Sequence, residues 1–209
     1  MTILITGGTG RLAAELKKHL EGEYVGIEHW DFICADNIPN KKYDLIVHMG
    51  AYTDVVKGER ERKKCFDTNV VGTWNMVERY RDTPFVYISS EYCKDPLGVY
   101  ALTKQLGEEI VKTHPKHLIF RTFFKPNPFP FPFAYGDQYT QGDYVDVIAK
   151  ILAERIKAWD RMTSDFRYLG TGRKTVLDLA KRTRPDVQEN SVDEYNAKIG
   201  MLLIPKDYE

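Results

Sequence analysis

Short apolar runs alternate along the chain with longer stretches in which apolar residues recur every three or four positions. The short runs are rich in β-branched and aromatic residues and predict strands at 3–6, 24–27, 45–48, 85–88 and 118–121. The longer stretches predict amphipathic helices at 11–20, 63–80 and 100–113. Continuous apolar strands separated by helices are typical of a parallel sheet that is covered on both faces. The predicted fold is therefore α/β with a doubly wound parallel sheet.

The regular alternation stops at the segment KPNPFPFPF, residues 125–133, where four prolines exclude a helix or a central strand. This segment is expected either to form an aromatic substrate wall or to pack as a rigid crossing. Beyond it, the pattern predicts a helix at 144–159, a short strand at 166–170 and a helix at 175–183. We expect two parts: a core at 1–122, and a small substrate-side region at 123–209 that packs on the core.

A glycine-rich turn, TGGTGRLA at 6–13, lies between the first predicted strand and the first predicted helix. This context is the one that a dinucleotide fingerprint of the Rossmann type requires. Gly7 permits the tight turn, and Gly10 removes a side chain where the backbone approaches a pyrophosphate. The helix that begins with Arg11 and Leu12 offers free N–H groups to the phosphates. We therefore expect NAD or NADP to bind here.

An acidic residue that binds the adenosine ribose is expected about 20 positions beyond such a turn. Glu28 follows the second predicted strand and is placed for this role. A carboxylate there repels a 2′-phosphate, whereas the neighbouring His29 could tolerate one. The sequence therefore favours NAD slightly and leaves NADP open. The alternative is that Glu28 is a solvated loop carboxylate.

The segment YALTK places Tyr100 and Lys104 four residues apart, on the same face of a predicted helix. A nearby ammonium group lowers the pKa of a tyrosine and suits it to acid/base chemistry. Ser89 and Ser90 end the preceding predicted strand, at the carboxyl edge where such sheets bind ligands. Tyr100, Lys104 and Ser90 are therefore the predicted catalytic residues, and Ser89 is predicted to lie beside the cofactor.

Composition and charge remove several classes of function. The 209 residues include 30 Lys+Arg and 30 Asp+Glu, so no overall charge attracts the chain to nucleic acid or anionic lipid. No apolar run approaches the ~18 residues that a membrane span needs. The three cysteines are odd in number and lack CxxC spacing, which supports neither a disulfide framework nor a zinc site. We expect a cytoplasmic protein with no metal and no nucleic-acid or membrane partner.

Several segments, in order, resemble a known family. TGGTGRLA, VHMGAYTDV, FDTNVVGTWNMVE, ISSEY, YALTK and FRT are similar to motifs of extended short-chain dehydrogenase/reductases. Within that group the chain most resembles the dTDP-4-dehydrorhamnose reductases, and the most distinctive segment is GAYTDVVKGE. The similarity continues through DQYTQGDYVDVIA and LGTGRKTVLDLAKRTRPDV, so that it spans nearly the whole chain.

The resemblance implies an NAD(P)H-dependent reductase of a nucleotide-linked 4-keto-6-deoxy sugar. By it, Tyr100 protonates the developing alkoxide, Lys104 binds the nicotinamide ribose and lowers the pKa of Tyr100, and Ser90 holds the carbonyl. Further residues are assigned to the cofactor or to the sugar. Those beside the cofactor are Gly50, Ala51, Tyr52 and Asn69, and those toward the substrate are Thr53, Arg121 and Phe124. For Asn69 a packing role remains open, as does an ion pair for Arg121.

The chain also departs from that family. Only nine residues separate Ser90 from Tyr100, and the region after Arg121 is shorter than the usual substrate domain. A nucleotide-sugar 4-epimerase, which His48 also suits, and a non-catalytic NAD(P)-binding regulatory protein therefore remain alternatives. A 4,6-dehydratase is disfavoured because Ser90-Glu91-Tyr92 lacks a second carboxylate. The resemblance further implies a possible homodimer, paired through Val111 and parts of 63–80.

Overall fold

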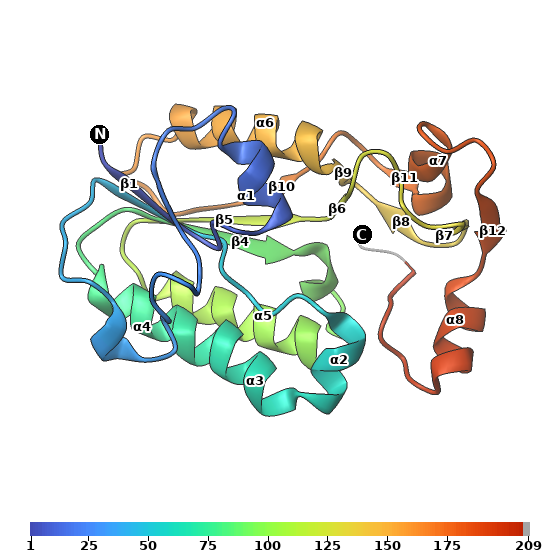
Figure 1. Cartoon of the computed structure of the whole chain (residues 1–209), viewed down its shortest axis with the longest axis horizontal. Helices are drawn as coiled ribbons and strands as arrows, with labels where there is room; N and C mark the ends of the chain where they lie inside the picture. Colours follow the sequence, from blue (N-terminus) through green and yellow to red (C-terminus); the bar gives the residue numbers. More distant parts are fainter. Residues whose placement is uncertain (207–209) are drawn as a thin grey trace.

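A central sheet of parallel strands organises residues 1–206, the part of the chain that the computed structural model describes (Figure 1). Its spatial order is β10-β5-β4-β3-β1-β2. The strands are β1 (Ile3–Thr6), β2 (Glu23–Val25), β3 (Leu45–His48), β4 (Phe85–Ser90), β5 (His117–Thr122) and β10 (Asp165–Leu169). The order reverses between β1 and β3, and this is the position at which doubly wound sheets bind ligands. The predicted α/β class is confirmed.

Helices cover both faces of the sheet because its strands are apolar on both sides. Ile3 and Ile5 pack with α1 (Arg11–Leu16) and α6 (Val145–Ala158), whereas Leu4 belongs to the opposite layer. That second layer contains α2 (Val55–Arg60), α3 (Arg62–Phe66), α4 (Gly72–Arg79) and α5 (Gly98–Lys112). Within residues 1–206, no helix is both long enough and apolar enough to cross a membrane.

The predicted helix at 63–80 is interrupted. A π-helical turn, η2 (Asp67–Val71), separates α3 from α4. Such a turn inserts an extra residue and redirects the side chains around it. Here it contains Asn69, which is 1% exposed and contacts the main chain of Tyr52. Periodicity alone does not reveal the interruption, since the turns on either side keep the helical spacing.

The outer side of α3, α4 and α5 carries large apolar side chains that remain exposed. These are Phe66, Trp74, Leu102 and Leu106, with exposed fractions between 36% and 48%. Val111 was predicted to belong to this surface, but it is fully buried among the core residues between α5 and the sheet. It lies five residues beyond Leu106 on α5, and this spacing turns it to the inner face of the helix.

The predicted boundary after residue 122 does not divide the molecule cleanly. Helix α6 packs its buried face against α1 and the sheet, and β10 pairs with β5 along five residues. Residues 145–169 therefore complete the core rather than belonging to a separate region. Their sequence pattern predicts the helix and strand well, but it does not indicate which sheet the strand joins.

The smaller part of the molecule lies at one end of the sheet and consists of residues 123–144 and 170–206 (Figure 1). It contains the two-stranded pairs β6–β9, β7–β12 and β8–β11, with the helices α7 and α8. Their bounds are β6 (Phe124–Lys125), β7 (Phe133–Tyr135), β8 (Tyr139–Thr140), β9 (Asp143–Tyr144), β11 (Lys174–Thr175), α7 (Val176–Lys181), β12 (Gln188–Asn190) and α8 (Val192–Ile199).

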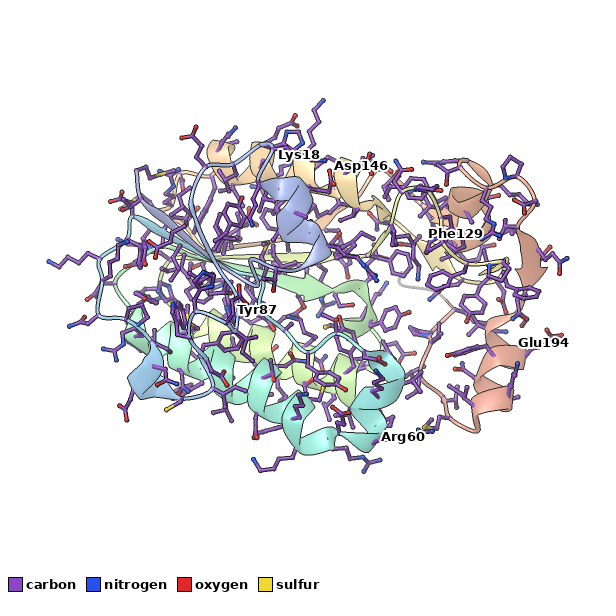
Figure 2. The ribbon with its side chains drawn as sticks, viewed as in Figure 1. Lys18, Arg60, Tyr87, Phe129, Asp146 and Glu194 are labelled. Carbon is purple, nitrogen blue, oxygen red and sulfur yellow. The ribbon has the colours of Figure 1, made fainter. Side chains whose placement is uncertain are left out.

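A buried carboxylate joins this smaller part to the core. Glu91, in the short 3-10 helix η3 (Glu91–Cys93) after β4, accepts hydrogen bonds from the Thr140 hydroxyl at 2.6 Å and from the Gln141 N–H at 3.2 Å. Burial raises the pKa of Glu91, although both hydrogen bonds act to lower it. The segment 125–133, rich in proline and phenylalanine, is called the Pro-Phe segment below. Its residue Phe129 is buried in a third apolar cluster (Figure 2).

Candidate active site

A cavity of about 800 Å³ opens at the carboxyl ends of β1, β3, β4 and β5. Its walls come from the glycine-rich turn, the loop after β3, the end of β4, helix α5 and the residues that follow β5. No residue of the Pro-Phe segment lines this cavity. The packed position of Phe129 therefore favours the rigid crossing over the substrate wall among the two expected roles.

The glycine-rich turn fits a dinucleotide pyrophosphate. Gly7 has φ +74°, and a Cβ placed on it would lie 2.9 Å from the backbone nitrogen of Gly50. Gly10 caps α1 without a side chain, so the first N–H groups of the helix, including those of Arg11 and Leu12, have no capping partner. Gly7, Gly10, Arg11 and Leu12 all line the cavity.

A second, mostly apolar cavity of about 260 Å³ adjoins the first through Gly7 and Ala51. Its walls include Trp30, Phe32 and Tyr52, which suits a flat aromatic base. Gly50, Ala51 and Tyr52, three of the predicted cofactor-binding residues, lie on its surface.

Glu28 lies outside both cavities. Its carboxylate is 3.1 Å from His29 Nδ1 and about half exposed, as in the solvated-loop alternative. Asp31, three residues later, lines the second cavity instead. Because β2 ends at Val25 and a turn follows, the acidic position nearest the cavity shifts along the chain. The sequence pattern did not indicate Asp31, although the aromatic Phe32 beside it was an available signal.

His48 is part of the scaffold under the second cavity. The Thr6 hydroxyl accepts hydrogen bonds from the N–H groups of Met49 and Gly50, so its own proton is directed to His48 Nδ1, 2.7 Å away. The opposite ring nitrogen lies 3.3 Å from the Thr73 hydroxyl. Burial lowers the pKa of His48 to about 3, so the ring is neutral. His48 does not reach either cavity, which removes the observation that had suited an epimerase.

Three predicted catalytic side chains meet at the wall of the larger cavity: Tyr100 and Lys104 from α5, and Ser90 from the end of β4. Burial raises the pKa of Tyr100 well above its usual value, and a hydrogen bond with Ser90 is the strongest influence that lowers it. The phenol is therefore protonated at neutral pH. Ser90 also accepts a hydrogen bond from the Tyr92 N–H at 3.2 Å, which fixes its hydroxyl.

Lys104 is held by β4 rather than by Tyr100. Its ammonium group donates a hydrogen bond to the Ile88 carbonyl at 2.8 Å and lies 4.0 Å from the centre of the Tyr87 ring. Burial lowers the pKa of Lys104 to about 8. Lys104 was expected to be the group that lowers the pKa of Tyr100. In the structure Ser90 has the larger effect, because the ammonium group is directed at β4.

The residues predicted for the substrate side divide into two sets. Phe124 and Thr53 line the larger cavity. Arg121 does not: its guanidinium pairs with Glu108 on α5, as in the ion-pair alternative. Ser89 reaches the cavity wall, but its hydroxyl donates to the same Glu108 carboxylate.

Asn69 is a packing amide. Its side chain accepts from the Tyr52 N–H at 2.8 Å and donates to the Thr103 hydroxyl at 3.0 Å, away from both cavities. It therefore acts on the cofactor side only through the main chain of Tyr52. The hydrogen bonds of a buried amide are fixed by tertiary contacts, which is why the sequence alone left both roles open.

Two aromatic residues of the larger cavity escaped prediction. Tyr92 lies edge-on to Tyr100, with ring centres 6.2 Å apart, and it stacks with Phe123 at 6.4 Å. Both Tyr92 and Phe123 line the cavity. Tyr92 belongs to the ISSEY segment and Phe123 directly follows the FRT segment, so proximity to the predicted Ser90 and Phe124 was the available signal. Within residues 1–206, no group of three or more His, Cys, Asp or Glu side chains is placed to hold a metal ion.

The fold and the site together define a Rossmann-type α/β protein with a Tyr/Lys/Ser group at the carboxyl edge of its sheet. The chain belongs to the family described as the RmlD substrate binding domain, whose model matches residues 1–124. This membership confirms the resemblance drawn from the sequence motifs.

Individual relatives agree with this family. A dTDP-4-dehydrorhamnose reductase of Sinorhizobium fredii is 28% identical over 147 residues, which cover 58% of this chain and 50% of that protein. The chain thus spans about half the length of the curated relatives it matches. The crystal structure of a dTDP-4-dehydrorhamnose reductase from Clostridium acetobutylicum is similar, with a TM-score of 0.80 and 22% identity over 93% of this chain and 85% of that one. A Bacillus anthracis dTDP-4-dehydrorhamnose reductase in complex with NADP has a TM-score of 0.78 at 20% identity, over 98% and 94% of the two chains.

Proposed function

We propose that the protein is an NAD(P)H-dependent reductase of a nucleotide-linked 4-keto-6-deoxy sugar. The observation that carries this proposal is the convergence of Tyr100, Lys104 and Ser90 on one cavity that begins at the glycine-rich turn. The names of the relatives support the sugar class. The nicotinamide cofactor would supply the hydride, and the side chains around the cavity would supply the proton and orient the ketone.

Tyr100 would act as the general acid. Because burial keeps its phenol protonated at neutral pH, the residue can give a proton to the oxygen that becomes an alkoxide when the ketone is reduced. Ser90, which hydrogen-bonds with Tyr100, would donate to the same oxygen and stabilise the charge that develops there. Tyr92 and Phe123 would form the apolar wall on the sugar side.

Lys104 would place a positive charge behind the reacting groups and bind the ribose next to the nicotinamide. With its pKa lowered to about 8, this residue is largely an ammonium ion at neutral pH. A positive charge in a buried site stabilises the anionic tyrosine that remains after proton transfer. A proton from solvent would then restore the phenol.

The residues of the second cavity bear on the choice between NAD and NADP. The slight preference for NAD rested on Glu28, which lies outside that cavity, whereas Asp31 lies on its wall together with Lys64. A carboxylate there opposes a 2′-phosphate and a lysine attracts it. We therefore propose a nicotinamide dinucleotide without restricting its phosphate. The similar Bacillus anthracis structure contains NADP.

The test is a spectrophotometric assay with dTDP-4-keto-6-deoxy sugar, in which the absorbance of NADH or NADPH is followed separately. Tyr100→Phe retains the ring and removes the proton donor, so it is expected to lower turnover by at least 100-fold, within the range known for general acids. Tight cofactor binding without net oxidation, in the wild-type protein, would contradict the reductase. It would favour the epimerase or the regulatory protein instead.

We also propose that two copies of the chain pair through the outer side of α3, α4 and α5. Exposed apolar side chains at Phe66, Trp74, Leu102 and Leu106 form a surface that water disfavours. A second copy would offer the same surface, as a two-fold interface requires. Because Tyr100 and Lys104 belong to α5, such pairing would stiffen the helix that carries them.

A further inference from the structure

The first turn of α5, which carries Tyr100, is capped by a side chain of α2. Leu97, the residue before α5, is apolar and makes no capping hydrogen bond. Instead, the Glu59 carboxylate accepts a hydrogen bond from the Val99 N–H at 2.5 Å, and its other oxygen pairs with Arg62 at 3.2 Å. The N–H groups of a first turn have no partner within the helix, and a carboxylate also suits the positive end of the helix dipole. Glu59 therefore fixes the backbone one residue before Tyr100.

The side chain of Leu203 covers this cap. Leu203 is 2% exposed, and its Cδ2 atom lies 2.5 Å from the position that a Cβ on Gly98 would occupy. Glu59 Oε1 lies 2.6 Å from the same position, so the leucine and the carboxylate meet at Gly98. The Glu59 side chain is only 12% exposed as a result. A hydrogen bond that is shielded from water in this way is stronger than one in a solvated position.

Leu203 belongs to a segment, residues 200–206, that follows α8 and is fixed to the smaller part of the molecule. The Asn196 side chain of α8 accepts a hydrogen bond from the Leu203 N–H at 3.2 Å. Further along, the Lys206 carbonyl accepts a hydrogen bond from the Tyr139 N–H at 2.7 Å. The segment is therefore held on both sides of Leu203, whose side chain reaches from the smaller part to α5.

Helix α2 lies against the backbone of Tyr100 as well. A Cβ placed on Gly58 would lie 3.8 Å from both the Cβ and the backbone nitrogen of Tyr100. Without the cap from Glu59, the first turn of α5 could move away from α2 and carry the phenol with it. A general acid must lie within hydrogen-bond reach of the atom that it protonates, so a displacement of about 1 Å has a large effect on the rate.

We propose that Glu59 and Leu203 are positioning residues for Tyr100. Glu59 holds the first turn of α5, and Leu203 shields the hydrogen bond by which it does so. The inference rests on the proposed function, because it concerns the orientation of the proton donor toward the ketone. Neither side chain lines the larger cavity, so each acts through the backbone that carries Tyr100. The segment 200–206 thereby couples the smaller part of the molecule to the reacting groups.

The experiment compares Leu203→Ala with Leu202→Ala. Leu202 is 69% exposed, so its truncation removes the same side chain at the neighbouring position without uncovering Glu59. Leu203→Met keeps an apolar side chain of similar size over the carboxylate, and Glu59→Ala removes the cap itself. A denaturation curve shows whether each variant is folded, and Leu203→Val, which removes less of the side chain, replaces Leu203→Ala if that variant is not.

Two measurements by nuclear magnetic resonance need no substrate: amide exchange at Val99, and the ring signal of Tyr100, assigned by its loss in Tyr100→Phe. Leu203→Ala and Glu59→Ala are expected to speed the exchange at Val99 about fivefold, the scale of one helix cap, and to shift the Tyr100 signal. In the reductase assay both should lower kcat about tenfold, a part of what a general acid contributes, while KM stays within about twofold. Leu203→Met and Leu202→Ala should resemble the wild type.

A Tyr100 signal and a kcat that are both unchanged in folded Leu203→Ala would overturn the inference, even with faster exchange at Val99, because the cap would then be structural only. An equal fall of kcat in Leu202→Ala would overturn it too. A wild-type protein that does not reduce the sugar contradicts the proposed function instead, and the Tyr100 signal still decides whether Leu203 and Glu59 set the position of the ring.

Discussion

Glu108 and Arg121 form a two-point ion pair behind the larger cavity. Arg121 Nε lies 2.8 Å from one carboxylate oxygen of Glu108, and Arg121 Nη2 lies 2.7 Å from the other. Glu108 is fully buried and also accepts a hydrogen bond from the Ser89 hydroxyl. Through this carboxylate, helix α5 is joined to β5 and to the end of β4. The same elements position Tyr100 and Ser90.

Removal of the arginine is expected to destabilise the protein strongly. Arg121→Met leaves the buried Glu108 without its partner, and the loss of one partner from a buried ion pair costs about 3–5 kcal/mol. Urea denaturation measures this change in the free energy of unfolding. The double variant Glu108→Gln with Arg121→Met removes both charges, so it should be more stable than Arg121→Met alone. A stable Arg121→Met protein with weakened dTDP affinity would instead restore the substrate role first expected for this residue.

His48 should make the protein sensitive to acid. Its folded pKa of about 3 lies below the usual value for an unfolded chain, so the neutral ring contributes stability that is complete above pH 6.5 and is lost as the pH falls toward 3. Between pH 6 and pH 4 this loss is about 2 kcal/mol.

The matched variant is His48→Gln, which keeps a polar side chain between Thr6 and Thr73 but cannot take up a proton. Urea denaturation at pH 6 and pH 4 gives the pH dependence for both proteins. The stability of His48→Gln is expected to depend less steeply on pH, because this variant lacks the buried imidazole. Some dependence should remain, because burial also lowers the pKa of His114, which both proteins contain. Equal slopes would show that folding does not lower the pKa of His48.

A charge on the outer side of α5 should separate the proposed dimer. Leu106 is 36% exposed and lies one turn beyond Leu102. In Leu106→Arg, the two-fold operation would bring the new charge into an apolar interface, where burial of an unpaired charge is costly. Light scattering coupled to size-exclusion chromatography should then report a monomer. Leu202→Arg, at a residue that is 69% exposed elsewhere, should keep the mass of the wild type. A monomeric wild-type protein would contradict the pairing.

Local pattern was sufficient for most of the fold. The runs at 3–6, 45–48 and 85–88 became β1, β3 and β4, because each is apolar on both sides and only a covered parallel sheet buries both sides at once. The sequence did not reveal that β10 returns to this sheet. Its pairing with β5 joins residues about 50 positions apart, and no local signal encodes such a pairing.

The candidate site was predictable where the backbone determines function. Gly7, Gly10 and the pair Tyr100/Lys104 lie at the cavity, because a turn and a helical spacing fix their positions. Arg121 and Asn69 turned away from it, because long or amide side chains choose among several partners that only the folded chain brings together. Glu28 lies outside both cavities for a different reason. The loop after β2 is irregular, and the expected spacing selected a residue three positions before Asp31, which lines the second cavity.

The late position of β10 and α6 has a consequence for how the chain is made. Translation releases the residues that carry the cavity motifs well before residue 169, the last of β10. Until then β5 is an open edge strand, and the side of the sheet that α6 will cover keeps apolar residues such as Val86 and Phe120 in contact with water. The nascent chain on the ribosome therefore carries every side chain of its Tyr/Lys/Ser group while its sheet is still incomplete. The sheet can therefore be completed only after residues up to 169 have been translated.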